Sequence, residues 1–350
     1  MKMREISEKF SKKVTYVSFF MAIFVVYIHA NNLAYYGISN EQFSIPNMIV
    51  KIGGGVLGGV AVPFFFMLSA YWLFRFNVFD NNADKILWKK LKRKIKTIMV
   101  PYLLWNTFGM LFYMLITHIP FAAKMMNNGE IINITFSNII GGIVFHKYYF
   151  TFWYLQDLIV LMALSPIILR LLRKKTLTIL LLAVNLIVTF FQIDLVIFKS
   201  TSLLFFVIGA FISVYGRDFF ENESNYAGIY LGLFIVTGIL RYFEFPIISQ
   251  ISLFVAPVLL WKGIDVIIQN KVYEKKNSWF VTQSFFIYAS HVIPVTIIGH
   301  ILAKVKSGYI WVTISYLITP WITLGLIYVS AVIIHKYIPR FYNLICGGRS

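Results

Sequence analysis

Long apolar runs separated by short polar segments form the dominant pattern of this chain. A membrane-spanning helix needs about 20 mostly apolar residues to cross a hydrocarbon core of about 30 Å. The pattern therefore predicts an all-α, polytopic integral membrane protein of about ten transmembrane helices, built as a single transmembrane domain over residues 1–350. The predicted spans cover residues 14–33, 56–76, 97–118, 150–171, 176–194, 198–215, 226–243, 247–268, 281–303 and 309–335.

The distribution of Lys and Arg between these runs predicts the orientation. An even number of spans puts both ends of the chain on one side of the membrane, and short cytoplasmic loops carry the excess of basic residues. With this topology, 25 of the 32 Lys and Arg residues lie on the side of the two termini. Both termini are therefore predicted to be cytoplasmic, in a multi-pass protein of the cell membrane.

The composition agrees with a membrane protein and limits the binding partners that we expect. Hydrophobic residues make up 59% of the chain and charged residues 13%, with a mean hydropathy of +0.75. The net charge of +18 would suit a nucleic-acid-binding surface, but the cations are spread over loops between apolar runs. We therefore expect a lipid bilayer as partner and no nucleic acid. Cys346 is the only cysteine, so a disulfide framework and a thiol-based metal site are excluded, and no metal is expected.

Two histidines within predicted spans are the first candidates for function. An ionisable side chain inside a membrane is costly and normally faces the helix-bundle interior or an aqueous cavity. His29 lies about 22 Å along the first predicted helix, and His291 lies about 15 Å along the ninth. At these depths both imidazoles are able to reach one cavity.

Further polar side chains share helix faces with these histidines or lie in other spans. Ser284, Tyr288 and His291 follow the spacing i, i+4, i+7 and are expected to form one stripe of a helix. Trp153 and Asp157 are spaced i, i+4, and the Asp157 carboxylate is suited to accept a hydrogen bond from an imidazole.

The alternative interpretation is that such groups only hold the helices together. Hydroxyl groups commonly make hydrogen bonds between transmembrane helices, so this is the favoured interpretation for Ser69 and Ser284. For His29 the functional interpretation is favoured, because an imidazole titrates near neutral pH and needs a partner inside the membrane. For Asp157 and His291 both interpretations stay open.

A basic run, residues 85–96, precedes Pro101 and Tyr102 at the start of the third predicted span. Positive residues at the cytoplasmic end of a span are explained by membrane topology and by attraction to anionic lipid head groups. The second interpretation is a phosphate-binding site, because Arg and Lys bind polyphosphates such as that of coenzyme A. In that case Arg93, Lys96 and Tyr102 are the candidate binding residues.

Six segments, in this order, resemble the membrane acyltransferase-3 family over nearly the whole chain. The opening segment ends in the histidine that is essential in the family, which corresponds to His29. The segments are Phe19–His29 (FFMAIFVVYIH), Val62–Phe74 (VPFFFMLSAYWLF), Arg93–Trp105 (RKIKTIMVPYLLW), Phe152–Pro166 (FWYLQDLIVLMALSP), Ser284–His291 (SFFIYASH) and Pro339–Arg349 (PRFYNLICGGR).

The resemblance implies an enzyme of the bacterial plasma membrane that transfers an acyl group from acyl-CoA, first of all acetyl-CoA, to a cell-surface glycan or lipid-linked sugar. No tightly bound cofactor is expected, and the oligomeric state is not predicted. The hypothesis assigns catalysis to His29, Asp157 and His291, donor binding to Arg93, Lys96 and Tyr102, and acceptor binding to Ser69, Tyr71, Trp153, Ser284 and Tyr288. His29 would act as general base or accept the acyl group itself.

Three departures from the family pattern limit what carries over. Many members have an arginine eleven residues before the histidine, where this chain has Ser18. The family's Arg-x-x-Arg becomes Arg93-x-x-Lys96, which keeps the charge but loses one bidentate group. Many members also have an extracytoplasmic esterase-like domain, which we do not expect here, so the membrane domain itself would complete the transfer.

Two other functions remain open from sequence. Intramembrane His and Asp residues also serve proton relays, so a proton-coupled transporter or flippase is one alternative. A catalytically silent relative that binds a glycan is the other, because Ser18 replaces the family arginine.

Overall fold

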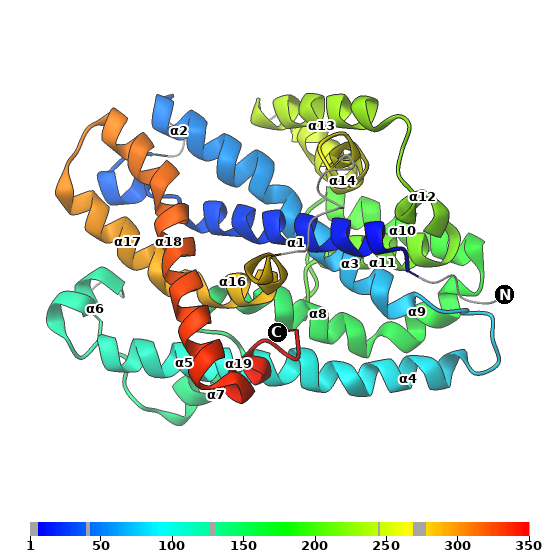
Figure 1. The fold of residues 1–350 in the computed structure, drawn as a ribbon, viewed down its shortest axis with the longest axis horizontal. Coiled ribbons are helices and arrows are strands. Elements are labelled where there is room, and N and C mark those ends of the chain that lie inside the picture. Colours follow the sequence, from blue (N-terminus) through cyan, green and yellow to red (C-terminus); the bar gives the residue numbers. More distant parts are fainter. Residues whose placement is uncertain (1–5, 40–42, 127–129, 244–245, 269–277, 350) are drawn as a thin grey trace. The chain divides into compact units, whose positions relative to one another are not determined.

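The computed structural model describes residues 6–39, 43–126, 130–243, 246–268 and 278–349. Within these ranges the regular structure is helical, apart from one isolated β-bridge between Leu195 and Phe198. The first half contains α1 (Glu8–His29), η1 (Leu33–Tyr36), α2 (Ile45–Val50), η2 (Lys51–Leu57), η3 (Gly58–Val60), α3 (Ala61–Phe74), α4 (Ala83–Lys94), η4 (Ile95–Met99), α5 (Val100–Ile116), α6 (Pro120–Met126), α7 (Phe136–Val144), η5 (Phe150–Phe152), α8 (Trp153–Ala163) and α9 (Ser165–Leu172). The second half contains α10 (Lys175–Phe190), α11 (Ser200–Tyr215), α12 (Arg217–Glu221), α13 (Ala227–Tyr242), α14 (Pro246–Gly263), η6 (Ile264–Val266), η7 (Trp279–Gln283), α16 (Ser284–Ser290), α17 (Val292–Val305), α18 (Tyr309–Tyr337) and α19 (Pro339–Ile345) (Figure 1).

The helices confirm the predicted all-α, polytopic membrane architecture. In the part of the chain that the structure describes, five helices are long and apolar enough to cross a membrane, or seven if each of two bent helix pairs is one span. Three further apolar helices, α10, α11 and α13, coincide with predicted spans but have 16 residues each. A 16-residue helix is about 24 Å long, which is shorter than a typical hydrocarbon core of about 30 Å.

Two predicted spans are not continuous helices, which corrects the expectation for residues 150–171 and 281–303. The first bends by 57° between α8 and α9, and the second bends by 73° between α16 and α17. Each bend precedes a proline, Pro166 or Pro294, whose ring lacks an N–H and clashes with the carbonyl four residues earlier. The helix that carries Ser284 and Tyr288 therefore ends at Ser290, and His291 lies at the bend between the two helices.

Both bends satisfy a carbonyl group in the same way. Ser165 Oγ donates to the Met162 carbonyl at 2.6 Å, and His291 Nδ1 donates to the Tyr288 carbonyl at 2.7 Å. In each case a side chain at the bend reaches a carbonyl three residues earlier. Inside a membrane this matters because lipid offers no replacement partner for an exposed backbone group.

The chain divides into two compact units. Unit 1 comprises Met1–Val25, Lys51–Arg93 and Asp157–Ser284, and unit 2 comprises Val26–Val50, Lys94–Gln156 and Phe285–Ser350. Helix α1 begins in unit 1 and ends in unit 2.

Close helix packing organises unit 1. Helices α3 and α11 run side by side (Figure 1), and Gly209 of α11 lies directly against the backbone carbonyl of Met67. A Cβ atom at position 209 would collide with that carbonyl oxygen, so only glycine permits this approach. Helices α13 and α14 form a second pair, in which Phe234 and Ala256 are buried against Val60.

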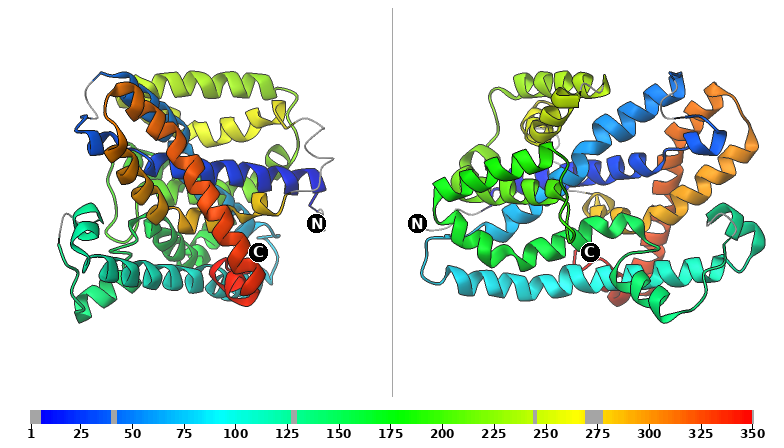
Figure 2. Two further views of the ribbon diagram at one scale, coloured as in Figure 1. Left: turned by 60° about the vertical axis from the view of Figure 1, so that its left-hand side comes forward. Right: turned by 180° about the vertical axis from the view of Figure 1, so that it is seen from behind.

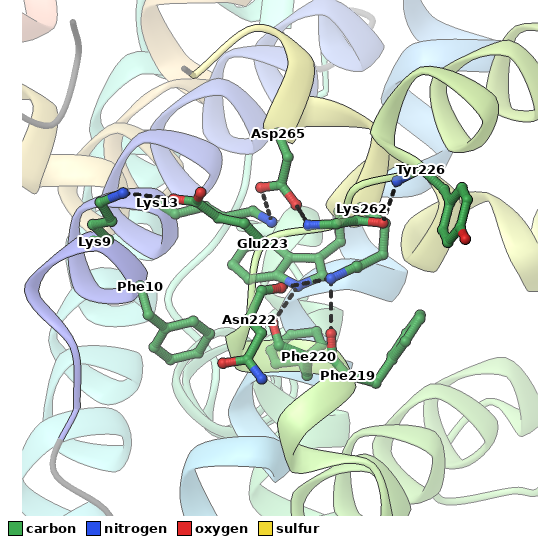
Figure 3. Close-up of polar contacts among 12 residues, drawn as sticks. Lys9, Phe10, Lys13, Phe219, Phe220, Asn222, Glu223, Tyr226, Lys262 and Asp265 are labelled. Atoms are coloured by element: carbon green, nitrogen blue, oxygen red, sulfur yellow. Dashed lines mark hydrogen bonds and ion pairs between the residues drawn. The ribbon is translucent and has the colours of Figure 1, made fainter. Parts of the chain in front are cut away.

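A buried charged cluster joins α1 to the end of α14 and to η6 within unit 1 (Figure 3). Lys13 Nζ lies 2.6 Å from Asp265 Oδ1 and 4.0 Å from the centroid of the Trp261 ring. Lys262 Nζ donates to the carbonyls of Phe219 at 2.8 Å and Asn222 at 2.6 Å. The positive charges are thus matched by a carboxylate, a ring face and backbone oxygens, as burial requires.

Unit 2 is built around α5, α17 and α18. Helices α17 and α18 pack against each other, and α7 packs on α5 (Figure 2). Asn32, just after α1, donates to Ser315 Oγ at 2.6 Å and to the Val312 carbonyl at 3.2 Å. This buried amide fixes the end of α1 against α18, and with it the position of His29.

Candidate functional site

The two histidines singled out by sequence lie together in unit 2. The ring centroids of His29 and His291 are 5.1 Å apart, with an angle of 36° between the ring planes. The Phe150 ring contacts His29 edge-on at 5.4 Å. His29 is partly buried, whereas His291 is completely buried. Of the two imidazoles, His29 is therefore the one that an external molecule can reach.

Local geometry fixes the proton on the His291 ring. A backbone carbonyl only accepts hydrogen bonds, so the contact to Tyr288 requires the hydrogen on Nδ1. Nε2 then keeps its lone pair, and it has no hydrogen-bond partner among the described residues. A buried polar atom without a partner calls for an explanation, and here the neighbouring His29 ring makes a role in the chemistry a candidate.

The segment that carries Phe150 is held rigidly against α16. Tyr288 donates to the Thr151 carbonyl at 2.8 Å, and Tyr149 donates to the Ala289 carbonyl at 2.6 Å. The Phe152 and Tyr288 rings stack at 5.7 Å with an angle of 9° between their planes. These contacts position the backbone on both sides of the histidine pair.

Thr151 is a candidate that the sequence analysis missed. Its side chain is buried, and Oγ1 has no hydrogen-bond partner in the described part of the chain. It follows Phe150, which contacts His29. A single Thr before a Trp gives no sequence signal, because only folding brings residues 149–152 to the histidines.

Asp157 belongs to unit 1, where its carboxylate has two partners. Asp157 Oδ2 accepts hydrogen bonds from Ser202 Oγ at 2.6 Å and from the backbone N–H of Lys199 at 3.1 Å. The carboxylate thereby joins α8 to the start of α11. Its predicted role in orienting an imidazole stays a prediction.

The remaining predicted acceptor residues lie in different surroundings. Tyr71 is completely buried, and its hydroxyl donates a hydrogen bond to Glu221. Glu221 Oε1 also accepts a hydrogen bond from Arg75 Nε at 2.8 Å. Ser69 is partly buried on α3, and Trp153 and Ser284 are partly buried at the first positions of α8 and α16. Tyr288 lies next to the histidine pair, since its ring centroid is 6.2 Å from that of His291.

The predicted donor-binding residues differ in exposure. Arg93 on α4 and Lys96 on η4 are both exposed. Tyr102 is buried, and its hydroxyl donates to the Val144 carbonyl at 2.6 Å and to Gln156 Oε1 at 3.4 Å. Arg93 and Lys96 are therefore accessible to an anion, while Tyr102 joins α5 to α7 and α8.

The described residues contain no group of three or more His, Cys, Asp or Glu side chains arranged to hold a metal ion. The chemistry at hand is that of imidazole: one ring nitrogen with a bare lone pair, next to a second, accessible imidazole. Such a pair is suited to accept a proton from a hydroxyl or to attack an activated carbonyl carbon.

Comparisons with known proteins agree with the sequence resemblance. The profile of the acyltransferase domain matches residues 14–335. The succinoglycan biosynthesis protein ExoH of Rhizobium meliloti (strain 1021) is 23% identical over 317 residues, which cover 85% of this chain and 81% of that protein. No solved structure matches the chain. Because the match runs from within α1 to within α18 and thus covers most of the chain, the chain belongs to the acyltransferase-3 family of membrane proteins and is an acyltransferase.

Proposed function

We propose that this protein is a membrane-bound O-acyltransferase that moves an acyl group from acyl-CoA, first of all acetyl-CoA, to a hydroxyl group of a cell-surface polysaccharide or glycolipid. Membership of the family supports acyl transfer, and a relative named for succinoglycan biosynthesis supports a polysaccharide acceptor. The proposal includes ten crossings of the bacterial plasma membrane with both termini in the cytoplasm, for which the Lys and Arg distribution is the support.

The observation that carries the proposal is the pairing of His29 with His291 at 5.1 Å. We assign the reacting role to His29, because its side chain retains access. His291 is the fully buried partner, and its Nε2 is available to accept a hydrogen bond from the His29 ring. A histidine supported by a hydrogen-bond acceptor is a recurring arrangement in acyl transfer.

The proposed reaction balances with these two side chains. His29 removes the proton of the sugar hydroxyl, and the oxygen bonds to the carbonyl carbon of the thioester. The carbon–sulfur bond breaks, and the proton passes from the imidazole to the leaving thiolate, which gives free coenzyme A. If His29 instead takes the acyl group first, the same bonds change in two steps.

Replacement of His29 by Ala tests the proposal. We expect the ester content of the surface polysaccharide to fall at least about 10²-fold, the smallest usual contribution of a general base. The measurement is mass spectrometry of surface sugars, with the amount of protein in the membrane fraction determined in parallel. His118, an exposed histidine after α5, provides the matched control as His118→Ala.

Unchanged acylation in the His29 variant would remove His29 from the chemistry. A second measurement separates acyl transfer from proton-coupled transport. Purified protein in detergent should release free coenzyme A from acetyl-CoA when a sugar acceptor is added. A transporter would leave acetyl-CoA intact under these conditions.

A further inference from the structure

We propose that Arg349 binds a phosphate group of the acyl donor, and that the Gly347–Arg349 segment forms a preorganised part of the donor site. The inference rests on the proposed function, because it takes acyl-CoA as the donor. It adds a binding residue in unit 2, on a segment that follows His291 by about 60 residues along the chain.

The backbone of this segment is locked in place. Gly347 and Gly348 have φ angles of 64° and 71°, the left-handed region that favours glycine. At Gly347 a Cβ atom would collide with the Thr97 carbonyl oxygen and approach Pro101 Cγ at 3.1 Å. The segment thus packs backbone to backbone against the junction of η4 and α5, where a larger residue would not fit.

Helix α19 provides a second anchor immediately before the glycines. Trp105 Nε1 of α5 donates to the Ile345 carbonyl at 3.1 Å. Tyr342 is completely buried and its ring lies 5.1 Å from that of Phe286 on α16. The segment is therefore held by α5 and α16 together, which places the next side chain, Arg349, with precision.

Arg349 presents its guanidinium group at this point. The guanidinium carbon lies 4.5 Å from the centroid of the Phe285 ring, and Nη1 donates to the Cys346 carbonyl at 3.3 Å. The residue is nevertheless exposed, and no ion pair joins it to a carboxylate in the described part of the chain. A guanidinium has five N–H donors, so several remain available to a phosphate.

The surrounding charges favour an anion. The sequence of unit 2 contains two acidic side chains, Glu41 and Glu130, and both lie in loops predicted to be extracytoplasmic. Lys96, which is exposed, directly precedes the Thr97 carbonyl that Gly347 contacts. Arg349 and Lys96 are thus carried by two segments that touch, with no acidic residue on either.

Helix α16 connects this cation to the histidine pair. Phe285, which contacts Arg349, is its second residue, and His291 follows its last residue. At a rise of 1.5 Å per residue, the two positions are about 9 Å apart along the helix. A donor whose phosphates and thioester are separated by a flexible arm fits such an arrangement, whereas a lipid head group bound at Arg349 needs no relation to the histidines.

The test uses the full chain purified in an uncharged detergent, with binding of coenzyme A measured by calorimetry. We expect Arg349→Gln to weaken binding by roughly tenfold, and Arg349→Lys to restore part of the loss, because the charge returns without the planar group. Arg340→Gln is the matched control, since Arg340 is an exposed arginine on α19 with the same charge. It should bind coenzyme A like the wild type.

Gly347→Ala gives an independent variant that leaves the cation in place. A methyl group there has to displace the segment from Thr97, so coenzyme A binding should fall while the protein still purifies as a monodisperse species. If Arg349→Gln binds coenzyme A as tightly as the wild type, the inference is overturned and the proposed function stands. If the wild type itself does not bind coenzyme A, the proposed donor fails, and the inference with it.

A second experiment, in lipid vesicles, distinguishes coenzyme A from a lipid head group as the source of the phosphate. Wild type and Arg349→Gln are reconstituted in vesicles of neutral lipid with and without an anionic phospholipid. A difference that appears only as retained anionic lipid, with equal affinity for coenzyme A, would assign Arg349 to lipid head groups and overturn its role toward the donor.

Discussion

The charged cluster of unit 1 and the histidine pair of unit 2 both bury titratable side chains, but they differ in how completely these are satisfied. In unit 1, Lys13 pairs with Asp265 at 2.6 Å, and the second carboxyl oxygen of Asp265 accepts from the Ser224 N–H at 3.2 Å. In unit 2, His291 Nδ1 donates a hydrogen bond to the Tyr288 carbonyl, whereas Nε2 has no partner among the described residues. In the described part of the chain, unpaired buried atoms also occur at Asn106 and Ser213. Neither burial nor a missing partner alone therefore distinguishes structure from function, and at His291 the second observation is the His29 ring beside it.

The largest expected effect comes from breaking the pair in unit 1. Lys13→Ala leaves the Asp265 carboxylate buried without its counter-charge, which should destabilise the protein by about 3–5 kcal/mol. The measurement is thermal unfolding in detergent. Lys9→Ala is the control, since Lys9 pairs with Glu223 at 3.4 Å on an exposed surface, where a pair contributes about 0–1 kcal/mol.

A double variant that removes both charges of the Lys13–Asp265 pair tests the same comparison more sharply. Lys13→Met combined with Asp265→Leu should recover most of the lost stability, because no buried charge remains unpaired. Equal destabilisation by Lys13→Ala and Lys9→Ala would contradict a buried, structural pair. In all of these variants the acyl transfer per folded molecule should stay as in the wild type.

The next effect concerns chemistry rather than stability. His291→Ser preserves a donor for the Tyr288 carbonyl, as Ser165 does for Met162 at the other bend, but removes Nε2. We expect kcat to fall by about 10²-fold or more with little change in KM and in unfolding temperature. A variant that loses stability and keeps its kcat would assign His291 to the helix bend alone.

A smaller effect is expected at the support of the histidine pair. Tyr149→Phe removes the hydroxyl that donates to the Ala289 carbonyl, and the loss should cost about 1 kcal/mol in unfolding free energy. Tyr226→Phe, at an exposed tyrosine of unit 1, should cost nothing measurable. Equal unfolding temperatures for the two variants would show that this bond does not hold the 149–152 segment.

The smallest expected effect concerns Cys346, whose thiol should not react with maleimide in the folded protein. Burial raises the pKa of the Cys346 thiol to about 12, so maleimide should modify it only after unfolding at neutral pH. Because the folded pKa lies above the value of 9.0 for an unperturbed thiol, this group contributes stability below pH 9 and loses it as the pH rises toward 12. Rapid labelling of native protein would contradict the buried position of the segment that precedes Arg349.

The sequence predicted the elements better than their continuity. Hydrophobic runs and the cost of ionisable groups in lipid were enough to place the helices and to single out His29 and His291. The periodicity of Ser284, Tyr288 and His291 did not reveal that α16 ends at Ser290, before Pro294, although the Tyr288 and His291 rings remain neighbours at 6.2 Å. Pro257 and Pro320 lie inside the continuous helices α14 and α18, so a proline in the sequence was not enough to locate this bend.

Other features needed the fold. Thr151 and Tyr149 reach the histidine pair only because η5 packs against α16, which no spacing along the chain reveals. Likewise, the contact between Gly347 and Thr97 joins segments about 250 residues apart, counted roughly along the chain. The sequence match at Pro339–Arg349 marked that segment as similar to the family but gave no partner for it.

The two bends have a consequence for how the protein enters the membrane. Within each bent pair, the two helices meet the requirement of length and hydropathy only when taken together. The insertion machinery selects segments by their composition, so we expect α16 and α17 to enter the bilayer as one segment and to bend afterwards. The angle at His291 then forms during assembly of the helices, and a chain that is inserted but not yet packed would have His291 without its contact to His29.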